Sequence, residues 1–207
     1  MNSGTERNTE EKILKAARQV FTEKGMAGAR MQEIADKAGI NKAMLHYYFR
    51  SKEKLFDRVF KEAFGLFWPR VDQYLQTTTD LKTLLKAIVT SYIDVLIDQP
   101  FLPIFILNEL HRNPDHLKRL FFETGVDPTQ LLEIIKGEMA AGNIVEMDPR
   151  ELLVNILSLS LFPFAARPLV SRILWDNDQE SYVAFLKERK NTVYEFIVRA
   201  VFVSSAC

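Results

Sequence analysis

Apolar residues recur at helical spacing along almost the whole chain, and this pattern constrains the fold more than any other feature of the sequence. Strand signals are nearly absent, because no Asn-Gly or Asp-Gly hairpin turn occurs and no long run alternates β-branched with polar residues. Prolines at Pro100, Pro114, Pro128 and Pro149 punctuate the pattern where helices begin or end. The sequence therefore predicts an all-α protein.

Capping residues place the limits of the expected helices. Asn8 is expected to cap the first helix, which ends before Gly25. Ser51 is expected to cap a long helix that runs toward Leu75. The other helices are expected at residues 31–38, 42–49, 80–98, 101–112, 115–123, 128–141, 149–166 and 178–203.

The short helices at 31–38 and 42–49 are separated by only the three residues Gly39-Ile40-Asn41. Two helices joined by such a turn describe a helix-turn-helix. Leu45 and Phe49 lie four residues apart, so they share one face of the second helix, which we expect to be buried. The opposite face is then free to contact a partner.

That opposite face carries Ala43 and Tyr47, flanked by Lys42, Met44 and His46. A small residue permits close approach to DNA, aromatic rings pack on thymine methyl groups, and a lysine reaches a base edge or a phosphate. The sequence therefore favours entry of this helix into the major groove. The alternative is that the tyrosines are core residues that pack against the next helix.

Charge, cysteine content and hydropathy narrow the class of protein. Residues 1–54 carry 11 Lys and Arg against 7 Asp and Glu, which suggests a polyanionic partner at this end. The single cysteine, Cys207, excludes an internal disulfide and fits the cytoplasm. The apolar stretch Leu152 to Ala166 is shorter than a membrane span of ~20 residues and is expected to be a buried helix, and no signal peptide or membrane partner is expected.

The segment "MQEIADKAGINKAMLHYYFRSKEKLF" resembles the DNA-binding region of the tetracycline-repressor (TetR) family of transcriptional regulators. The resemblance covers about residues 9–56 and includes "ILKAARQVFTEKG" at Ile13 to Gly25. The matching positions are Ile34-Ala35, Gly39-Ile40, Leu45, Tyr48-Phe49, Arg50 and Lys52-Glu53. It implies a helix-turn-helix domain at residues 1–54 and a helical effector-binding and dimerisation domain at residues 55–207.

Three positions depart from the family pattern. Arg30 stands where a capping threonine that contacts phosphate is usual, which puts the capping role in doubt. Ala43 replaces a common glycine, and His46 replaces a usual tyrosine, which suggests a changed operator preference. The resemblance implies phosphate contacts from His46 and Lys52, and Arg30 is expected to neutralise a phosphate although it departs from the pattern. It implies base and groove contacts from Gln32, Lys42, Ala43, Met44, Tyr47 and Tyr48.

The remainder of the chain is expected to dimerise and to bind an effector. The apolar helix at 151–166 and two apolar rows on the last helix predict a homodimer through a four-helix bundle. The two rows are Tyr182, Leu186, Val193, Ile197 and Ala200, and Val183, Phe196 and Val201. The resemblance also implies a cavity for an apolar or aromatic small molecule, with Trp68, Tyr92, Phe105, Asn108 and Glu109 as candidate lining residues.

The function predicted is a ligand-responsive DNA-binding transcriptional regulator that binds a near-palindromic operator as a homodimer, with repression the commoner mode in the family. A dimeric helical scaffold without sequence-specific DNA binding is the alternative. An enzyme is not expected, because no motif of a nucleophile elbow, a dinucleotide fold, a P-loop or a zinc protease occurs. No cofactor or metal is expected either, since the spacing of His111, Asp115 and His116 divides them between helix faces.

Overall fold

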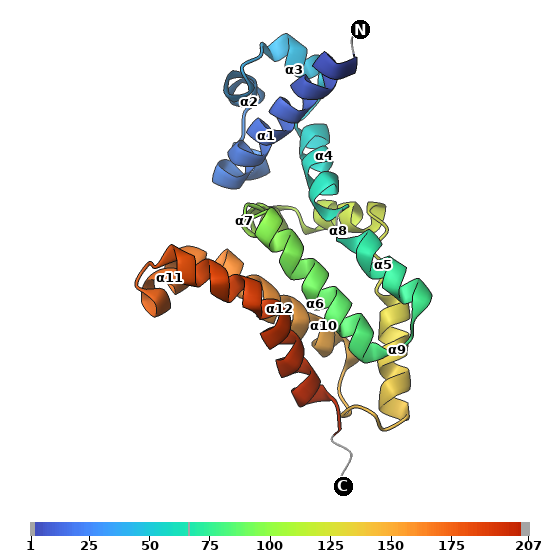
Figure 1. Cartoon of the computed structure of the whole chain (residues 1–207). Coiled ribbons are helices and arrows are strands. Elements are labelled where there is room, and N and C mark those ends of the chain that lie inside the picture. The colour runs from blue at the N-terminus through green and yellow to red at the C-terminus, as the bar shows by residue number, and fades with distance from the viewer. Residues whose placement is uncertain (1–2, 66, 204–207) are drawn as a thin grey trace. The chain divides into compact units, whose positions relative to one another are not determined.

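A computed structural model describes residues 3–65 and 67–203 and is helical throughout (Figure 1). The predicted all-α class is confirmed, since the pairing of Ile144 with Phe202 is an isolated bridge and no strand occurs in the described ranges. Cys207, the single cysteine of the chain, lies outside the described residues. Among those residues no single helix is both long and apolar enough to cross a membrane, although two bent helix pairs pass on length and composition when combined.

The chain divides into two compact units. The first, called the N-terminal unit, consists of Met1–Gly65 and Phe101–Gly125, and the second, the C-terminal unit, consists of Leu66–Pro100 and Val126–Cys207. The helices of the N-terminal unit are α1 Ser3–Gly28, α2 Met31–Ala38, α3 Lys42–Tyr48, α4 Lys52–Phe64, α7 Leu102–Arg112 and α8 Pro114–Glu123. Those of the C-terminal unit are α5 Trp68–Thr77, α6 Leu81–Asp98, α9 Thr129–Ala140, α10 Pro149–Ala165, α11 Arg167–Trp175 and α12 Gln179–Val201. The expected functional boundary between residues 54 and 55 stays a prediction, because these units reflect packing alone.

Two expected helix limits were wrong, and the expected end before Gly25 is a kink at that residue (φ 67°, ψ 174°), beyond which α1 continues to Gly28. Asn8 lies inside α1, which begins at Ser3. Residues 3–8 carry no apolar side chain, so the sequence pattern gave no sign of helix before Asn8. The helix expected to run from Ser51 toward Leu75 is two helices, α4 and α5. The break follows from Gly65, where an added Cβ would lie 2.7 Å from the Lys61 carbonyl oxygen, and from Pro69, which lacks the N–H that a continuing helix needs.

One helix was missed. α11 occupies residues that the sequence analysis left between its last two helices. Pro168 lies in its first turn, where proline is well tolerated. The fully buried position of α11 is Ser171, while Leu169, Ile173 and Leu174 are exposed. Val170 and Trp175 pack against the core, but the exposed apolar residues on the other faces leave no single apolar stripe, so helical periodicity did not reveal this short helix.

The N-terminal unit is held together by aromatic rings from three helices. The Phe56 ring of α4 stacks on the Phe105 ring of α7 at a centroid distance of 4.5 Å, and both lie against Phe21 of α1. All three side chains are fully buried. Burying a side chain of this size contributes about 1.5–3 kcal/mol, so these rings fix α4 and α7 against the long helix α1.

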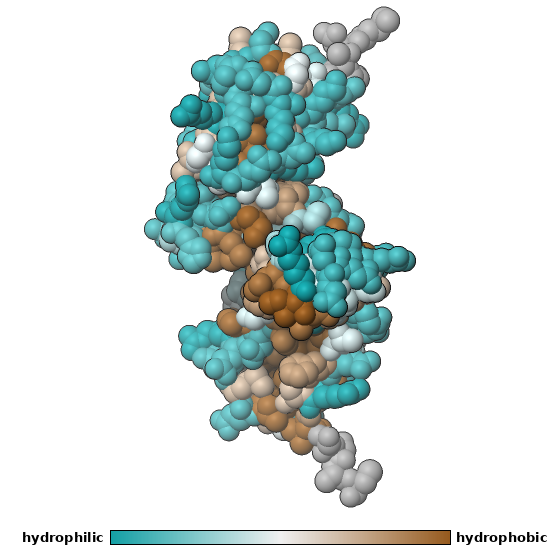
Figure 2. Space-filling model, turned by 90° about the vertical axis from the view of Figure 1, so that its left-hand side faces the viewer, coloured by the Kyte–Doolittle hydropathy of each residue, from teal (hydrophilic) through white to brown (hydrophobic). Residues whose placement is uncertain are grey.

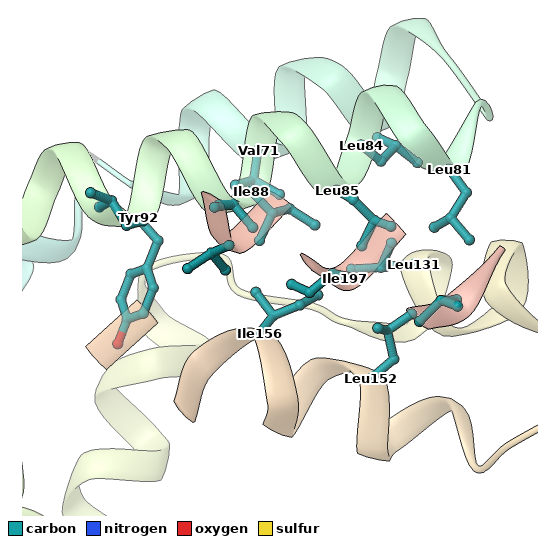
Figure 3. Packing of buried hydrophobic residues seen from close by; sticks show 14 of the residues in the cluster. Val71, Leu81, Leu84, Leu85, Ile88, Tyr92, Leu131, Leu152, Ile156 and Ile197 are labelled. Atoms are coloured by element: carbon teal, nitrogen blue, oxygen red, sulfur yellow. The ribbon is translucent and has the colours of Figure 1, made fainter. Parts of the chain in front are cut away.

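The C-terminal unit has a larger and mainly aliphatic core around α6. Figure 3 shows side chains from α6, among them Leu85 and Ile88, pointing toward Ile156 and Leu152 of α10. The last helix, α12, adds the predicted row Tyr182, Leu186, Val193 and Ile197, all of which are buried. The assignment of the next residue was wrong: Val201 is buried and Ala200 is exposed, because the row continues in a step of four.

Candidate nucleic-acid interface

The turn between α2 and α3 is closed by backbone hydrogen bonds at one end and by a side chain at the other. Gly39 adopts φ 69° and ψ 31°, a left-handed conformation that glycine reaches at little cost. The Gly39 N–H donates to the Asp36 carbonyl at 3.1 Å and the Ile40 N–H to the Ala35 carbonyl at 3.0 Å. The Asn41 side chain then accepts from the Met44 N–H at 2.7 Å, which confirms the predicted cap of α3.

α3 has one buried and one exposed face, as the sequence predicts. Leu45 is fully buried and Phe49, just past the helix, is 8% exposed. Ala43 is exposed, and Tyr47 is 77% exposed, with its ring packed edge-on against Tyr48. The outward face is therefore not part of the core of this molecule, and the alternative in which Tyr47 is a core residue is wrong.

The cations near this face differ from those elsewhere in the unit. Arg30, Lys42 and Arg50 are exposed and form no ion pair within the described part of the chain. By contrast, the Lys24 and Lys37 ammonium groups lie 2.6 and 3.3 Å from carboxylate oxygens of Glu33 and Glu23. Uncompensated positive charge thus gathers around α3, which is the electrostatic pattern expected of a surface that binds a polyanion.

Residues at the start of α2 add to this surface. Arg30 occupies the N-cap position in an extended conformation, and its side chain makes no capping hydrogen bond, as its chemistry predicts. The Gln32 side chain donates to the Asp36 carboxylate at 2.7 Å. The Asp36 carboxylate thus accepts a hydrogen bond from Gln32, and the Glu33 carboxylate accepts one from Lys24. The negative charges near the start of α2 therefore have partners, whereas the positive charge of Arg30 has none in the described residues.

Besides Gln32, three of the nine candidate residues have internal hydrogen-bond partners. The Lys52 ammonium donates to the carbonyls of Ala27 and Ala29 at 3.2 and 3.1 Å, so it ties the start of α4 to the end of α1. The half-buried Tyr48 hydroxyl lies 3.5 Å from the Glu6 carbonyl, and His46 Nδ1 lies 3.4 Å from the Arg50 carbonyl. The Lys52 ammonium has three N–H groups, so one remains to bind a phosphate. Its hydrogen bonds to the two backbone carbonyls were not predicted from the sequence.

The five candidate ligand residues do not come together within either unit. Trp68 and Tyr92 belong to the C-terminal unit, where Tyr92 is almost fully buried and burial raises the pKa of its hydroxyl. Phe105, Asn108 and Glu109 belong to the N-terminal unit. They have structural contacts there: the Asn108 amide lies 3.5 Å from the Thr22 carbonyl, which helps to join α7 to α1.

A buried polar cluster in the N-terminal unit was not predicted. His116 of α8, which is 8% exposed at its side chain, lies with Nδ1 3.0 Å from Glu109 Oε1 and Nε2 2.7 Å from Asp57 Oδ1. Burial alone lowers the pKa of His116, but the hydrogen bonds to the two carboxylates outweigh it and the net pKa is raised. The cluster links α4, α7 and α8, and sequence spacing could not find it because Asp57 is 59 residues away from His116.

The same cluster bears on metal binding. Each ring nitrogen of His116 faces a carboxylate, so both are donors in the charged form and neither offers a lone pair to a cation. Within the described ranges no group of three or more His, Cys, Asp or Glu side chains has a geometry that could hold a metal ion.

Comparison with known sequences identifies the N-terminal region. Residues 13–59 match the family described as "Bacterial regulatory proteins, tetR family". The transcriptional activator FasR of Mycolicibacterium smegmatis is 38% identical over 84 residues, which is 41% of this chain and 38% of FasR. The transcriptional repressor NicS of Pseudomonas putida is 33% identical over 105 residues, half of each chain. The matched stretch thus spans half or less of the length of these two relatives.

Comparison with solved structures extends the likeness over the whole chain. The hemolysin II transcriptional regulator HlyIIR superposes with a TM-score of 0.67 at 25% identity, covering 96% of this chain and 99% of that protein. The strongest sequence likeness lies in the helix-turn-helix region, whereas the fold as a whole is shared with HlyIIR.

Proposed function

The chain belongs to the tetR family of bacterial regulatory proteins, and from this premise we propose that it is a DNA-binding transcriptional regulator that inserts α3 into the major groove of an operator. One observation carries the proposal: α3 turns Ala43 and Tyr47 outward while Leu45 anchors it from behind. A surface helix with a buried tyrosine face would have no side chains left to read a base sequence.

The residues of this surface divide between base contacts and phosphate contacts. Lys42, Ala43, Met44 and Tyr47 lie on the exposed part of α3 and are assigned to base edges and groove walls, together with Gln32 and Tyr48. Arg30, His46 and Lys52 are assigned to phosphates on either side of the groove. The positive charge of Arg30 and Lys42 is not neutralised by a described neighbour, which supports both assignments.

The regulator acts as a homodimer through α10 and α12 in this proposal. These helices leave large apolar side chains exposed, namely Val154, Leu157, Phe162 and Phe196, and Figure 2 shows hydrophobic surface of the C-terminal unit on the face it displays. Exposed apolar side chains of this number on adjoining helices are typical of an interface between subunits. A two-fold dimer would place its two α3 helices ~34–36 Å apart, on a near-palindromic site.

Regulation by a small molecule completes the proposal. An apolar or aromatic effector would bind one arrangement of the dimer more tightly and shift the population away from the arrangement that fits DNA. Such a protein acts in the cytoplasm, where the chromosome is, and works by binding, without catalysing a reaction. FasR is an activator and NicS a repressor, so both modes occur among the relatives, and repression is the mode we propose.

Selection of bound fragments from a random DNA pool tests the proposal directly. We expect enrichment of a near-palindrome whose half-sites are about one helical turn, or a multiple of it, apart. Tyr47→Ala should reduce the enrichment or change the enriched sequence. Lys187→Ala, which alters an exposed residue of α12, should change neither. Absence of any sequence enrichment would favour a helical scaffold that does not read DNA.

A further inference from the structure

A groove on the C-terminal unit is lined by positive and hydroxyl-bearing side chains. It lies along α6, between α5 and α12, each of which packs against α6 (Figure 1), and it encloses about 320 Å³. That volume is near the lower limit for sites that hold small molecules, ~300 Å³. The lining residues are Tyr74, Lys82, Thr83, Lys86, Ala87, Thr90, Ser91 and Tyr194.

The charge of this groove is unbalanced. Lys82 and Lys86 lie one helical turn apart on α6, where like charges repel each other. Their ammonium groups lie over aromatic rings, Lys82 at 4.7 Å from the Phe202 centroid and Lys86 at 5.7 Å from that of Tyr194. Neither lysine forms an ion pair with a carboxylate in the described residues; Lys82 interacts at longer range with the Asp80 carboxylate, and no such partner is described for Lys86. An anion placed between them would relieve the repulsion.

No carboxylate among the described residues lines the groove to serve as that anion. Asp80, at the start of α6, is engaged by the Thr83 N–H at 2.9 Å and by the Thr83 hydroxyl. Asp94, two turns beyond Lys86, is paired with Lys190. Lys82 is therefore compensated only in part, by Asp80, and Lys86 is not compensated by a described carboxylate.

Hydroxyl groups on the floor and walls lack partners. Ser91 is 7% exposed, yet its hydroxyl forms no hydrogen bond with any described residue. The hydroxyls of Tyr74, Thr90 and Tyr194 are likewise unpaired within the described ranges. The Ser91 oxygen is not among the polar atoms that are sealed from solvent without a partner, so it stays accessible and can form a hydrogen bond with an occupant or with water.

We propose that this groove binds a small organic anion, with its carboxylate or phosphate between Lys82 and Lys86 and its body against the rings of Tyr74 and Tyr194. The ammonium groups supply charge-assisted hydrogen bonds, and Ser91 and Thr90 supply neutral ones. The tyrosine rings and Ala87 supply apolar contact for the rest of the ligand. This site is separate from the five residues that the sequence suggested for an effector.

Calorimetric titration of the full-length protein at low salt tests the site with four probes: phenyl phosphate, benzoate, inorganic phosphate and phenol. We expect saturable binding of phenyl phosphate or benzoate, weaker binding of inorganic phosphate, and none of phenol. The double variant Lys82→Ala/Lys86→Ala should weaken binding of the aromatic anions by about tenfold or more, because two charge-assisted contacts are lost. Ser91→Ala should weaken it by a smaller factor.

The matched control is Lys118→Ala/Lys187→Ala, which removes the same charge from exposed positions outside the groove. It should leave the affinity for the aromatic anions unchanged. The proposal would be overturned if neither aromatic anion bound saturably, if the control weakened binding as much as the groove variant, or if inorganic phosphate bound as tightly as phenyl phosphate.

A regulatory role for this groove rests on the proposed function as a DNA-binding regulator. Binding of the anion in the groove does not depend on that function. Operator affinity measured with and without saturating phenyl phosphate separates the two. Saturable binding without an effect on operator affinity would support the site and count against its being the effector site. Binding of the anion by a protein that bound no DNA would leave the site standing and the proposed function refuted.

Discussion

The two compact units bury polar groups in different ways. The N-terminal unit encloses an imidazole between two carboxylates, with Glu109 only 2% exposed. The C-terminal unit instead buries uncharged hydroxyl groups, those of Ser91, Ser160 and Ser171 and of two tyrosines, Tyr92 and Tyr182, within a mainly aliphatic core. Charged buried groups must meet partners in a defined geometry, whereas aliphatic side chains need only fill space. The first unit is therefore built for fixed positions, and the second for close packing and association.

The largest expected effect tests whether the two cores are independent. Leu45→Ala should destabilise the N-terminal unit by about 2–5 kcal/mol, because it leaves a cavity behind α3, and should abolish operator binding. Leu84→Ala should have a similar effect on the C-terminal unit alone. Thermal unfolding followed by circular dichroism should show a different transition lowered in each variant. A single transition lowered equally by both would mean that the units unfold as one.

The next effect concerns the exposed apolar side chains of the C-terminal unit. Phe196→Glu should convert a dimer into monomers, because a buried charge at the interface is not compensated. The sedimentation coefficient should fall to the monomer value, and operator affinity should fall by about tenfold or more as the second half-site contact is lost. Phe122→Glu is the control, since Phe122 of the N-terminal unit is exposed to the same degree, 60% against 61%. Equal effects of the two changes would argue against dimerisation through α12.

A smaller effect separates compensated from uncompensated cations within the N-terminal unit. Arg30→Ala/Lys42→Ala should weaken operator binding, because a base contact of Lys42 and a phosphate contact of Arg30 are lost, and the lost phosphate contact should lower the slope of log affinity against log salt by about 1. Lys24→Ala/Lys37→Ala removes two cations that already have carboxylate partners and should change the slope little. Fluorescence anisotropy across a range of salt concentrations measures both. The assignment fails if the paired lysines prove as important as the unpaired residues.

The smallest effect is the pH dependence that the buried imidazole gives to the N-terminal unit. Because the folded-state pKa of His116 is raised, its contribution to stability is fully present below the unfolded value of ~6.5 and is lost as pH rises through the folded pKa. The change can reach ~1.4 kcal/mol per pH unit for one proton. His116→Gln, which cannot become charged, should remove this dependence from urea unfolding measured between pH 6 and pH 9.

Imidazole signals in NMR spectra test the same point without substitution. His116 should titrate at a higher pH than a histidine in an unfolded chain, ~6.5. Assignment is simple, because the chain has only three histidines and the other two, His46 and His111, are exposed. A titration of His116 at or below that value would show that the two carboxylates do not stabilise its charge.

The helix-turn-helix could be predicted from the sequence because its determinants are local. The left-handed turn at Gly39, the cap at Asn41 and the separation of Leu45 from Tyr47 all follow from residues within one or two turns of each other. α2 has the predicted limits, and α3 ends one residue earlier than predicted. Local chemistry alone is enough to specify such an element.

The remaining features depend on residues that are distant in sequence. His116 and Asp57 are 59 residues apart in the sequence, and Lys52 and Ala27 are 25 residues apart. No local sequence motif therefore indicates either hydrogen bond. The candidate ligand residues were separated for the same reason, since α7 packs on α1 instead of joining the core around α6. Aromatic and apolar residues indicate burial, but they do not indicate which core they enter.

The separation of buried and exposed residues on α3 has a consequence for how the DNA specificity of such a protein can evolve. The residues that hold the helix in place, such as Leu45, are distinct from those that face outward, such as Ala43 and Tyr47. A mutation on the outer face can therefore give a new target sequence with little penalty in folding, and copies of the gene can diverge in specificity while keeping one scaffold.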